Sequence, residues 1–290
     1  MSLAALSRMV KFEHSLFALP FAASAAVLVL PEAALDARRL LLVAVAVVAA
    51  RTAAMAMNRI ADRAFDARNP RTRRRELVTG EVSPGAAWAL LLGSSAALVA
   101  AAALISPLCG ALSLPVLAIL LGYSYAKRFT WAVHLWLGVA QALGPIGVAL
   151  ALTGRVPAAA VVLGLGVGAW VAGFDVLYSL QDMDFDRGER LRSIPARFGV
   201  QGALLWARLL HLAAALGIAG AGLVAGRGPG WLVGSVLMMA VLGAEHAYAA
   251  PGGKLRPERI GAAFFTFNAF ASVAFAACAL ADVALRVAPR

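Results

Sequence analysis

The chain has 290 residues, of which 62% are hydrophobic and only 14% charged, and its mean hydropathy is +0.81. A soluble domain carries about 25% charged and about 45–50% apolar residues, so a water-soluble enzyme and a disordered chain are both excluded. The net charge of +11 comes from 26 Lys and Arg against 15 Asp and Glu. Because these cations stand in short gaps between apolar runs, they indicate membrane topology rather than nucleic-acid binding.

Continuous apolar runs of about 20 residues recur along the whole chain, which is typical of a helical membrane protein. The runs do not alternate between apolar and polar residues, so a transmembrane β-barrel is excluded. We therefore predict an all-α bundle of about nine transmembrane helices that forms a single membrane domain over residues 1–290. The expected spans, in chain order, are 15–31, 40–60, 84–105, 108–126, 132–153, 157–180, 201–224, 229–250 and 260–284.

The distribution of Lys and Arg predicts the orientation of the chain in the membrane. With the N-terminus in the cytoplasm, 17 of these residues fall on the cytoplasmic side, 6 on the other side and 3 within spans, which accounts for all 26. This asymmetry favours a bacterial-type cytoplasmic membrane with the N-terminus inside. Two clusters of carboxylates lie on the same side, and because topology signals depend little on carboxylates, the clusters need another explanation.

The first acidic cluster stands at the end of the second expected span. Asn58, Asp62 and Asp66 are spaced by four residues, so on a helix their side chains follow one face and turn about 40° at each step. Arg51, seven residues before Asn58, falls on nearly the same face. The polybasic loop 68–76 that follows is interpreted either as a topology signal that contacts anionic lipid or as a lid that attracts a polyanionic substrate.

Further polar residues end the fourth span or stand near the expected cytoplasmic face. Tyr123 and Lys127 would share a helix face, where a phenol and an ammonium could hold a phosphate oxygen or anchor the helix in the interface. His14, His134 and His246 are expected as interfacial polar groups rather than catalysts.

The second acidic cluster stands at the end of the sixth span. Asp182 and Asp186 repeat the four-residue spacing, Asp175 lies seven residues before Asp182, and Tyr178 lies between them. Asp175 should sit one or two turns inside the bilayer, where an ionised group is costly and by default functional.

Carboxylates at this spacing repel each other by about 3–4 kcal/mol per pair at an effective dielectric of about 20, which favours divalent cations between them. Oxygen ligands without His or Cys predict Mg²⁺. Two such rows on facing helices would hold a diphosphate through its metal ions, whereas the alternative interpretation is a pair of solvated helix ends.

At these residues the chain resembles the UbiA superfamily of intramembrane aromatic prenyltransferases, and the resemblance covers essentially the whole chain. Segments 11–20, 69–72 and 192–197 resemble the 4-hydroxybenzoate polyprenyltransferase-like branch, which includes enzymes that prenylate 1,4-dihydroxy-6-naphthoate on the futalosine route to menaquinone. Arg59 is a departure, because the family often has Asp after the motif's Asn, and the first site therefore carries less negative charge. The matching residues are Arg51, Asn58, Asp62 and Asp66 for the first aspartate motif, Tyr123 and Lys127 for the YxxxK element, and Asp175, Tyr178, Asp182 and Asp186 for the second aspartate motif.

The resemblance implies Mg²⁺-dependent transfer of a polyprenyl group from polyprenyl diphosphate to an aromatic acid in respiratory quinone biosynthesis. The acid would be 4-hydroxybenzoate or 1,4-dihydroxy-6-naphthoate, the enzyme would be surrounded by membrane lipid, and no nucleic acid would take part. Asp175 would orient the aromatic ring or accept its proton, and the expected catalytic residues are Asp62, Lys127, Asp175 and Asp182. The implied metal ligands are Asn58, Asp62, Asp66, Asp182 and Asp186, and the implied substrate contacts are Arg51, Asn58, Arg63, Tyr123, Lys127, Arg128, Tyr178 and Arg192.

Two other classes of membrane protein stay open at this point. A secondary transporter also has many apolar helices and intramembrane charge, although its charged sites usually lie at mid-membrane. A CDP-alcohol phosphotransferase also uses membrane aspartates with Mg²⁺, but its DGxxAR signature is absent from this sequence.

Overall fold

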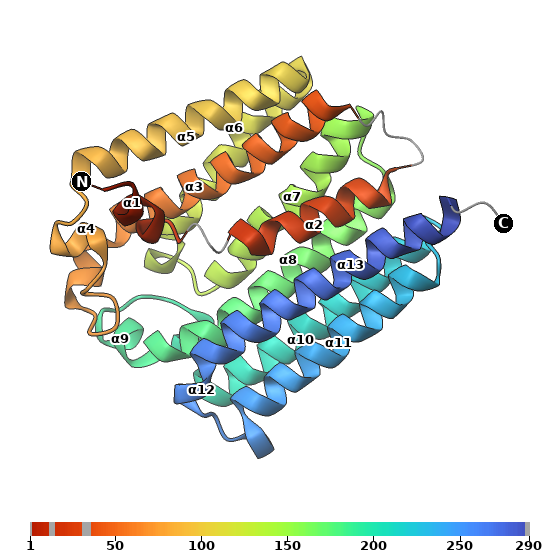
Figure 1. The fold of residues 1–290 in the computed structure, drawn as a ribbon. Coiled ribbons are helices and arrows are strands. Elements are labelled where there is room, and N and C mark those ends of the chain that lie inside the picture. Colours follow the sequence, from red (N-terminus) through yellow and green to blue (C-terminus); the bar gives the residue numbers. More distant parts are fainter. Residues whose placement is uncertain (1, 12–14, 31–35, 288–290) are drawn as a thin grey trace. The chain divides into compact units, whose positions relative to one another are not determined.

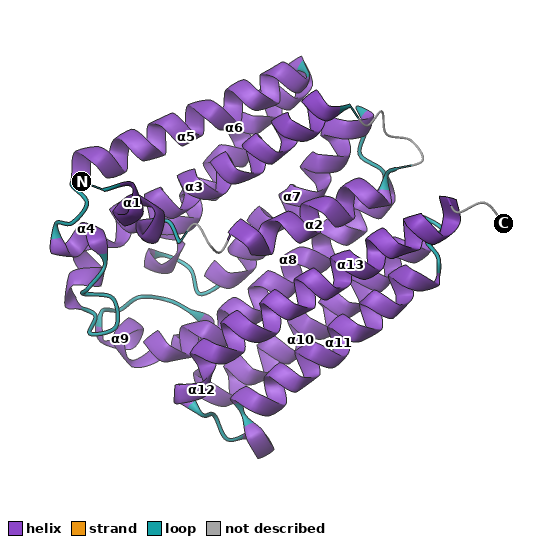
Figure 2. Ribbon diagram, viewed as in Figure 1, coloured by secondary structure: helices purple, strands orange, loops and turns teal. Residues whose placement is uncertain are grey.

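The computed structural model describes residues 2–11, 15–30 and 36–287. Figure 2 shows that the regular elements of these ranges are all helical, with no strand among them, which confirms the predicted all-α class. The chain divides into two compact units. Unit 1 comprises Met1–Leu19 and Asp36–Tyr125, and unit 2 comprises Pro20–Leu35 and Ala126–Arg290. The single domain expected over the whole chain stays a prediction.

Unit 1 is built on one long helix, α3, which runs for 32 residues from Ala37 to Arg68. Asp36 begins the helix by accepting a hydrogen bond from the Arg39 backbone N–H at 2.8 Å. The helix ends before Asn69, which precedes Pro70 and is therefore driven out of the helical conformation. The other helices of unit 1 are α1 (Leu3–Met9), α4 (Glu76–Thr79), α5 (Pro84–Ile105) and α6 (Pro107–Gly122), followed by a 3₁₀ turn that begins at Tyr123.

The core of unit 1 supports the middle of α3. Met9 of α1, Ala53 and Ala56 of α3, Leu77 of α4 and Leu91 of α5 are all buried in one apolar cluster. Small residues on α3 let its neighbours approach closely, which is typical of helix packing in membranes. This packing positions the C-terminal half of α3, which carries the first acidic cluster.

Unit 2 contains most of the remaining helices, which Figure 1 labels in chain order. Its short helix α2 (Ser15–Leu28) is shared with unit 1 at its first residues. The others are α7 (Val133–Thr153), α8 (Ala158–Ser179), a 3₁₀ turn (Leu180–Asp182), α9 (Met183–Gly188), α10 (Ile194–Val224), α11 (Pro229–Ala249), a 3₁₀ turn (Pro251–Gly253), α12 (Pro257–Ala262), a π-helical turn (Ala263–Phe267) and α13 (Asn268–Val287).

Glycines bring α8 into close contact with both of its neighbours in unit 2. A Cβ at Gly164 would lie 2.6 Å from the Ala142 carbonyl oxygen of α7, and a Cβ at Gly168 would overlap the Gly138 carbonyl oxygen. On the α10 side, a Cβ at Gly166 would lie 2.8 Å from a backbone nitrogen. Only glycine fits such contacts, so these residues set the distances between the helices.

Eight helices among the described residues are long and apolar enough to cross a membrane. They match the second to ninth expected spans. The first expected span, 15–31, corresponds to α2, whose 14 residues are apolar but too few for a helix that needs about 17–25 residues to span the bilayer.

Unit 2 also contains a buried series of hydrogen-bonded side chains that was not predicted from the sequence. The Trp170 indole N–H donates to Asn268 Oδ1 at 2.7 Å, and the Asn268 amide donates to Glu245 Oε1 at 2.9 Å. These three side chains come from α8, α13 and α11. Hydrogen bonds of this kind satisfy polar groups that would otherwise be costly inside a membrane protein.

Candidate functional site

The first acidic cluster lies in unit 1 and begins as the spacing predicts. The Asn58 amide donates a hydrogen bond to Asp62 Oδ2 at 3.1 Å, so these two side chains share a face of α3. Both are half-buried, whereas Asp66 is only 6% exposed. The cluster therefore presents one amide oxygen and two carboxylates along the last turns of α3.

Arg75, from the polybasic loop, neutralises Asp66. Its Nη1 lies 2.7 Å from each of the two carboxylate oxygens. The loop is fastened to the end of α3, because the Thr72 hydroxyl donates to the Asp66 backbone carbonyl at 3.3 Å and Asn69 Oδ1 accepts from the Arg71 backbone N–H at 2.9 Å. Sequence reasoning missed Arg75 as a partner, since nothing in a run of arginines indicates which one turns inward.

Two other arginines of α3 are held by backbone carbonyls of the N-terminal segment. Arg59 is 4% exposed, and its Nε donates to the Met9 carbonyl at 3.0 Å while Nη1 lies 3.3 Å from Asn58 Oδ1. Arg51 Nη2 donates to the Lys11 carbonyl at 3.3 Å. The residue that departs from the family pattern, Arg59, thus adds positive charge directly beside Asn58.

The second acidic cluster lies in unit 2 and gathers around Lys127. The ammonium Nζ lies 3.0 Å and 3.3 Å from the two oxygens of Asp186, which is only 2% exposed. The Lys127 charge also interacts with Asp182 and Asp175. The structure therefore brings together four of the predicted site residues, namely Lys127 and the three carboxylates Asp175, Asp182 and Asp186.

The helical path through this cluster differs from the prediction. The α8 helix ends at Ser179, a 3₁₀ turn covers Leu180–Asp182, and the short helix α9 follows, so Asp175 and Asp182 do not lie on one continuous α-helix. The segment Tyr123–Arg128 is also 3₁₀-helical. With three residues per turn, positions 123 and 127 lie about 120° apart, so the argument that they share a helix face is wrong.

The loop after α9 folds back onto the segment that carries Lys127. The Arg192 backbone N–H donates to the Lys127 carbonyl at 2.7 Å, and its Nη1 donates to the Phe129 carbonyl at 2.7 Å. Arg128 is exposed. The Tyr178 ring packs against Phe264 of the π-helical turn, with ring centroids 4.5 Å apart. Two predicted substrate contacts, Arg192 and Arg128, thus lie in the same part of unit 2 as Lys127.

Asp175 contacts His134 of α7, which was expected only as an interfacial polar group. His134 is 1% exposed, and its Nδ1 lies 2.7 Å from Asp175 Oδ2. Its Nε2 lies 3.4 Å from the Ser179 hydroxyl. Asp175 keeps 19% of its side chain exposed. The three residues form a chain of polar contacts between α7 and the end of α8.

The other two histidines named from the sequence have different outcomes. His246 is half-buried, and its Nε2 lies 3.0 Å from Nδ1 of His211, which is 4% exposed. The two rings join α10 to α11, and the expected interfacial position of His246 stays a prediction. His14 lies outside the described residues.

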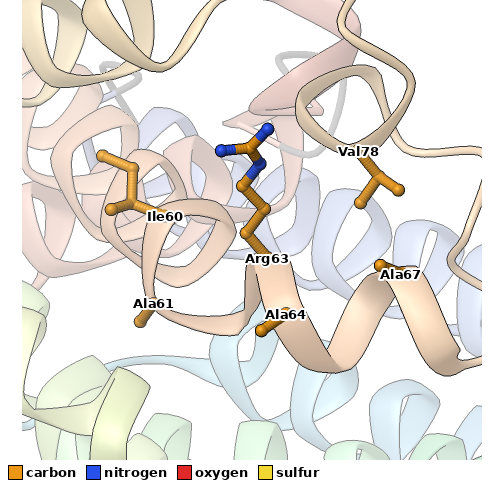
Figure 3. Close-up of a pocket in the computed structure, with 6 residues that line it drawn as sticks. All are labelled: Ile60, Ala61, Arg63, Ala64, Ala67 and Val78. Carbon is orange, nitrogen blue, oxygen red and sulfur yellow. The ribbon is translucent and has the colours of Figure 1, made fainter.

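Arg63 lines a pocket of about 420 Å³ in unit 1 (Figure 3). Its Nε donates to the Leu77 carbonyl at 3.2 Å. With 3.6 residues per turn, the lining residues of α3 lie roughly opposite the acidic face. The predicted contact of Arg63 with a diphosphate therefore stays a prediction. The other lining residues are Ile60, Ala61, Ala64, Ala67 and Val78.

The donor chemistry of the two clusters fits Mg²⁺. Carboxylates and one amide oxygen are the hard ligands this ion prefers, and it is usually held by one or two carboxylates together with substrate phosphates. Within residues 2–11, 15–30 and 36–287, no three His, Cys, Asp or Glu side chains converge on one point. The buried Asp66 and Asp186 instead contact the cations Arg75 and Lys127.

A model of the UbiA prenyltransferase family matches residues 18–269. One similar curated protein, the 4-hydroxybenzoate octaprenyltransferase of Aromatoleum aromaticum, is 36% identical over 201 residues, which cover 68% of this chain and 66% of that protein. The matched segments span between 50% and 66% of the length of this and two further relatives of the same name.

Solved structures with the same fold are also similar. The apo structure of a UbiA homolog from Aeropyrum pernix K1 has a TM-score of 0.84 and 36% identity, and the similarity covers 93% of this chain and 98% of that chain. A UbiA homolog from Archaeoglobus fulgidus, bound to GPP and Mg²⁺, has a TM-score of 0.70 and 22% identity over 97% of this chain and 99% of that chain.

Proposed function

Because this chain belongs to the UbiA prenyltransferase family, we propose that it transfers a prenyl group from a polyprenyl diphosphate to an aromatic acid with the help of Mg²⁺. Relatives of similar sequence are named 4-hydroxybenzoate octaprenyltransferases, which supports 4-hydroxybenzoate as the acceptor. The acid 1,4-dihydroxy-6-naphthoate is the second candidate. The A. fulgidus homolog bound to GPP and Mg²⁺ supports a prenyl diphosphate donor and this metal.

The single observation that carries the proposal is the buried charge cluster around Lys127. A lysine with three carboxylates at the end of a membrane helix is costly to build, and intramembrane charge of this kind by default serves a function. Lys127 and Arg192 would donate charge-assisted hydrogen bonds to the diphosphate. Tyr123 and Arg63 are further proposed donors, and Arg51 or Arg128 would hold the carboxylate of the acceptor.

The proposed metal ligands are oxygen donors from both acidic clusters. Bound Mg²⁺ would neutralise the negative charge that develops on the leaving diphosphate. The chain's apolar helices would admit the isoprenoid tail and exclude the water that could capture the allylic cation. These ligands would be Asn58, Asp62, Asp66, Asp182 and Asp186.

Asp175 is the proposed group on the acceptor side. Its carboxylate is partly exposed, and it lies on the same helix as Phe174 and Tyr178, whose rings both pack against Phe264. An aromatic ring held beside these side chains would present its hydrogen to the Asp175 carboxylate. Asp175 would orient the ring or accept this proton.

We propose that the protein lies in a bacterial-type cytoplasmic membrane with its N-terminus and active site facing the cytoplasm. The asymmetry of Lys and Arg supports this orientation. The diphosphate and the aromatic acid are both water-soluble charged groups, so a site at the cytoplasmic face would receive them directly. Family membership disfavours the secondary transporter and the CDP-alcohol phosphotransferase.

The test is Asp62→Ala and Asp182→Ala in a membrane prenylation assay with geranyl diphosphate, 4-hydroxybenzoate and added Mg²⁺. Each substitution removes a ligand oxygen and should lower turnover on the order of 100-fold or more. Asp184→Ala is the matched control, because Asp184 is an exposed acid of α9 outside the proposed ligand set. If Asp62→Ala and Asp182→Ala both retain near-normal turnover, the proposal is wrong.

A further inference from the structure

A histidine that the sequence does not connect with the second acidic cluster contacts its innermost carboxylate. The Asp175–His134 distance of 2.7 Å is that of a charge-assisted hydrogen bond. His134 is 1% exposed, whereas Asp175 keeps 19% of its side chain exposed. The carboxylate is therefore the solvent-accessible member of the pair, and the imidazole is enclosed by the protein.

The packing of α7 on α8 fixes this contact. The helices are antiparallel, and Gly164 faces Ala142 while Gly168 faces Gly138. Four residues further along α8, the contact thus lies four residues earlier on α7. Continued by one step, this register places His134 opposite the turn of α8 that begins at position 172 and leads to Asp175.

The contacts behind the imidazole hold the ring in place. The Ser179 hydroxyl lies 2.9 Å from the Val176 carbonyl oxygen and 3.4 Å from His134 Nε2. With the hydrogen of the neutral imidazole on Nδ1, this N–H donates to Asp175 Oδ2, and Nε2 can accept from the Ser179 hydroxyl.

In this arrangement both imidazole nitrogens take part in a hydrogen bond, so the buried ring leaves no polar atom unpaired. A fixed donor therefore holds Oδ2 of the Asp175 carboxylate.

We propose that His134 is a positioning residue for Asp175, whose carboxylate takes the proton from the prenylated ring; this inference rests on the proposed function. In that step the C–H bond at the newly alkylated ring carbon breaks. Its electron pair returns to the ring, and the proton forms an O–H bond at Asp175. His134 Nδ1–H donates to Oδ2, so the other carboxylate oxygen is held toward the ring and takes the proton.

The experiment compares His134→Leu and His134→Asn with the wild type in the full-length protein, reconstituted with geranyl diphosphate and Mg²⁺. The acceptors are 4-hydroxybenzoate and its analogue deuterated at the two ring carbons beside the hydroxyl. We expect kcat to fall on the order of 100-fold for His134→Leu while the KM for geranyl diphosphate stays unchanged. The isotope effect on kcat should rise from near unity to a clear primary effect, because loss of the ring proton becomes slow.

His134→Asn guards against misfolding of the leucine variant. Asparagine keeps an N–H donor toward Asp175, so this variant should retain more turnover than His134→Leu and show a smaller isotope effect. His211→Asn is the matched control, because His211 is equally buried but pairs with His246 rather than with a carboxylate. It should lower thermal stability and leave the isotope effect at the wild-type value.

The outcomes separate the inference from the function on which it rests. A wild type that forms no prenylated product from 4-hydroxybenzoate or from 1,4-dihydroxy-6-naphthoate contradicts the proposed function. A wild type that turns over, together with a folded His134→Leu variant whose isotope effect is unchanged, overturns the role of His134 alone. A rise in the isotope effect of His134→Leu that is smaller in His134→Asn and missing in His211→Asn supports it.

Discussion

At the scale of single residues, both acidic clusters neutralise a buried carboxylate with a cation from another segment. Asp66 receives Arg75 from the loop nine residues later, and Asp186 receives Lys127 from a segment 59 residues earlier. Burial of an unpaired charge costs roughly several kcal/mol, so each ion pair stabilises the fold. Each pair also keeps a cation close to a proposed ligand of Mg²⁺.

Arg75→Gln tests the pair at Asp66. It should lower the free energy of unfolding by about 1.5–3 kcal/mol, the range for a hydrogen bond to a charged group, because Asp66 then stays buried without its cation. The measurement is the melting temperature of the detergent-purified protein. Added Mg²⁺ should raise the melting temperature of Arg75→Gln more than that of the wild type, because the metal no longer competes with the guanidinium.

Arg73→Gln is the control for this prediction, because Arg73 stands in the same loop but is exposed. It should melt as the wild type does. An equal loss of stability in both variants would mean that the charge of the loop as a whole, and not the contact with Asp66, supports the fold.

At the scale of elements, the contact between α7 and α8 places His134 against Asp175. The small residues Gly138, Ala142, Gly164 and Gly168 let the two backbones approach closely. Side chains one or two turns further along can then form a hydrogen bond of 2.7 Å. The geometry of the acceptor side of the proposed site thus depends on residues that take no part in the chemistry.

Gly168→Ala tests this dependence, because a methyl group there would overlap the Gly138 carbonyl oxygen. Overpacking of this kind costs about 1–3 kcal/mol, so the melting temperature should fall. Turnover should fall with it, since the helices move apart and lengthen the His134–Asp175 contact. Activity and melting temperature of the purified variant are the measurements.

Gly147→Ala is the comparison, because no atom lies within 4 Å of a Cβ added at that position of α7. The substitution of glycine by alanine inside a helix is otherwise favourable by about 0.5–1 kcal/mol. It should therefore leave the protein unchanged or more stable. A similar loss of stability in both variants would contradict the prediction, because the loss at Gly168 could then not be assigned to its close contact with Gly138.

At the scale of the whole molecule, the proposed ligands of Mg²⁺ are distributed over the two units. Asn58, Asp62 and Asp66 belong to unit 1, whereas Lys127, Asp182 and Asp186 belong to unit 2. The proposed function uses oxygen donors from both acidic clusters, so loss of a carboxylate in either cluster should weaken binding of the diphosphate.

Asp62→Ala and Asp186→Ala, alone and together, test the shared ligand. Geranyl diphosphate with Mg²⁺ should raise the melting temperature of the wild type, because a ligand that binds only the folded state stabilises it. Each single variant should lose most of this rise, and the double variant should lose little more. Separate sites would instead give partial losses that add.

Site features that depend on local helical spacing were predicted, whereas contacts between residues distant in the sequence were not. Helical spacing predicts that Asn58 and Asp62 share a face, and their hydrogen bond confirms it. The partners Arg75 and His134 were not predicted, because the first is one of several arginines in a loop and the second lies 41 residues from Asp175. The end of α8 at Ser179 was not predicted either, because Asp182 and Asp186 keep the four-residue spacing beyond a 3₁₀ turn.

Composition and periodicity by themselves determined that this protein is a helical membrane protein with two acidic clusters and a lysine between them. They could do so because hydrophobic length and side-chain spacing are properties of consecutive residues. Only the tertiary structure decided which cation neutralises each buried carboxylate, and that His134 stands behind Asp175. Such pairs form where helices distant in sequence pack together, and the close contacts that set their distances come from glycines whose neighbours only the fold determines.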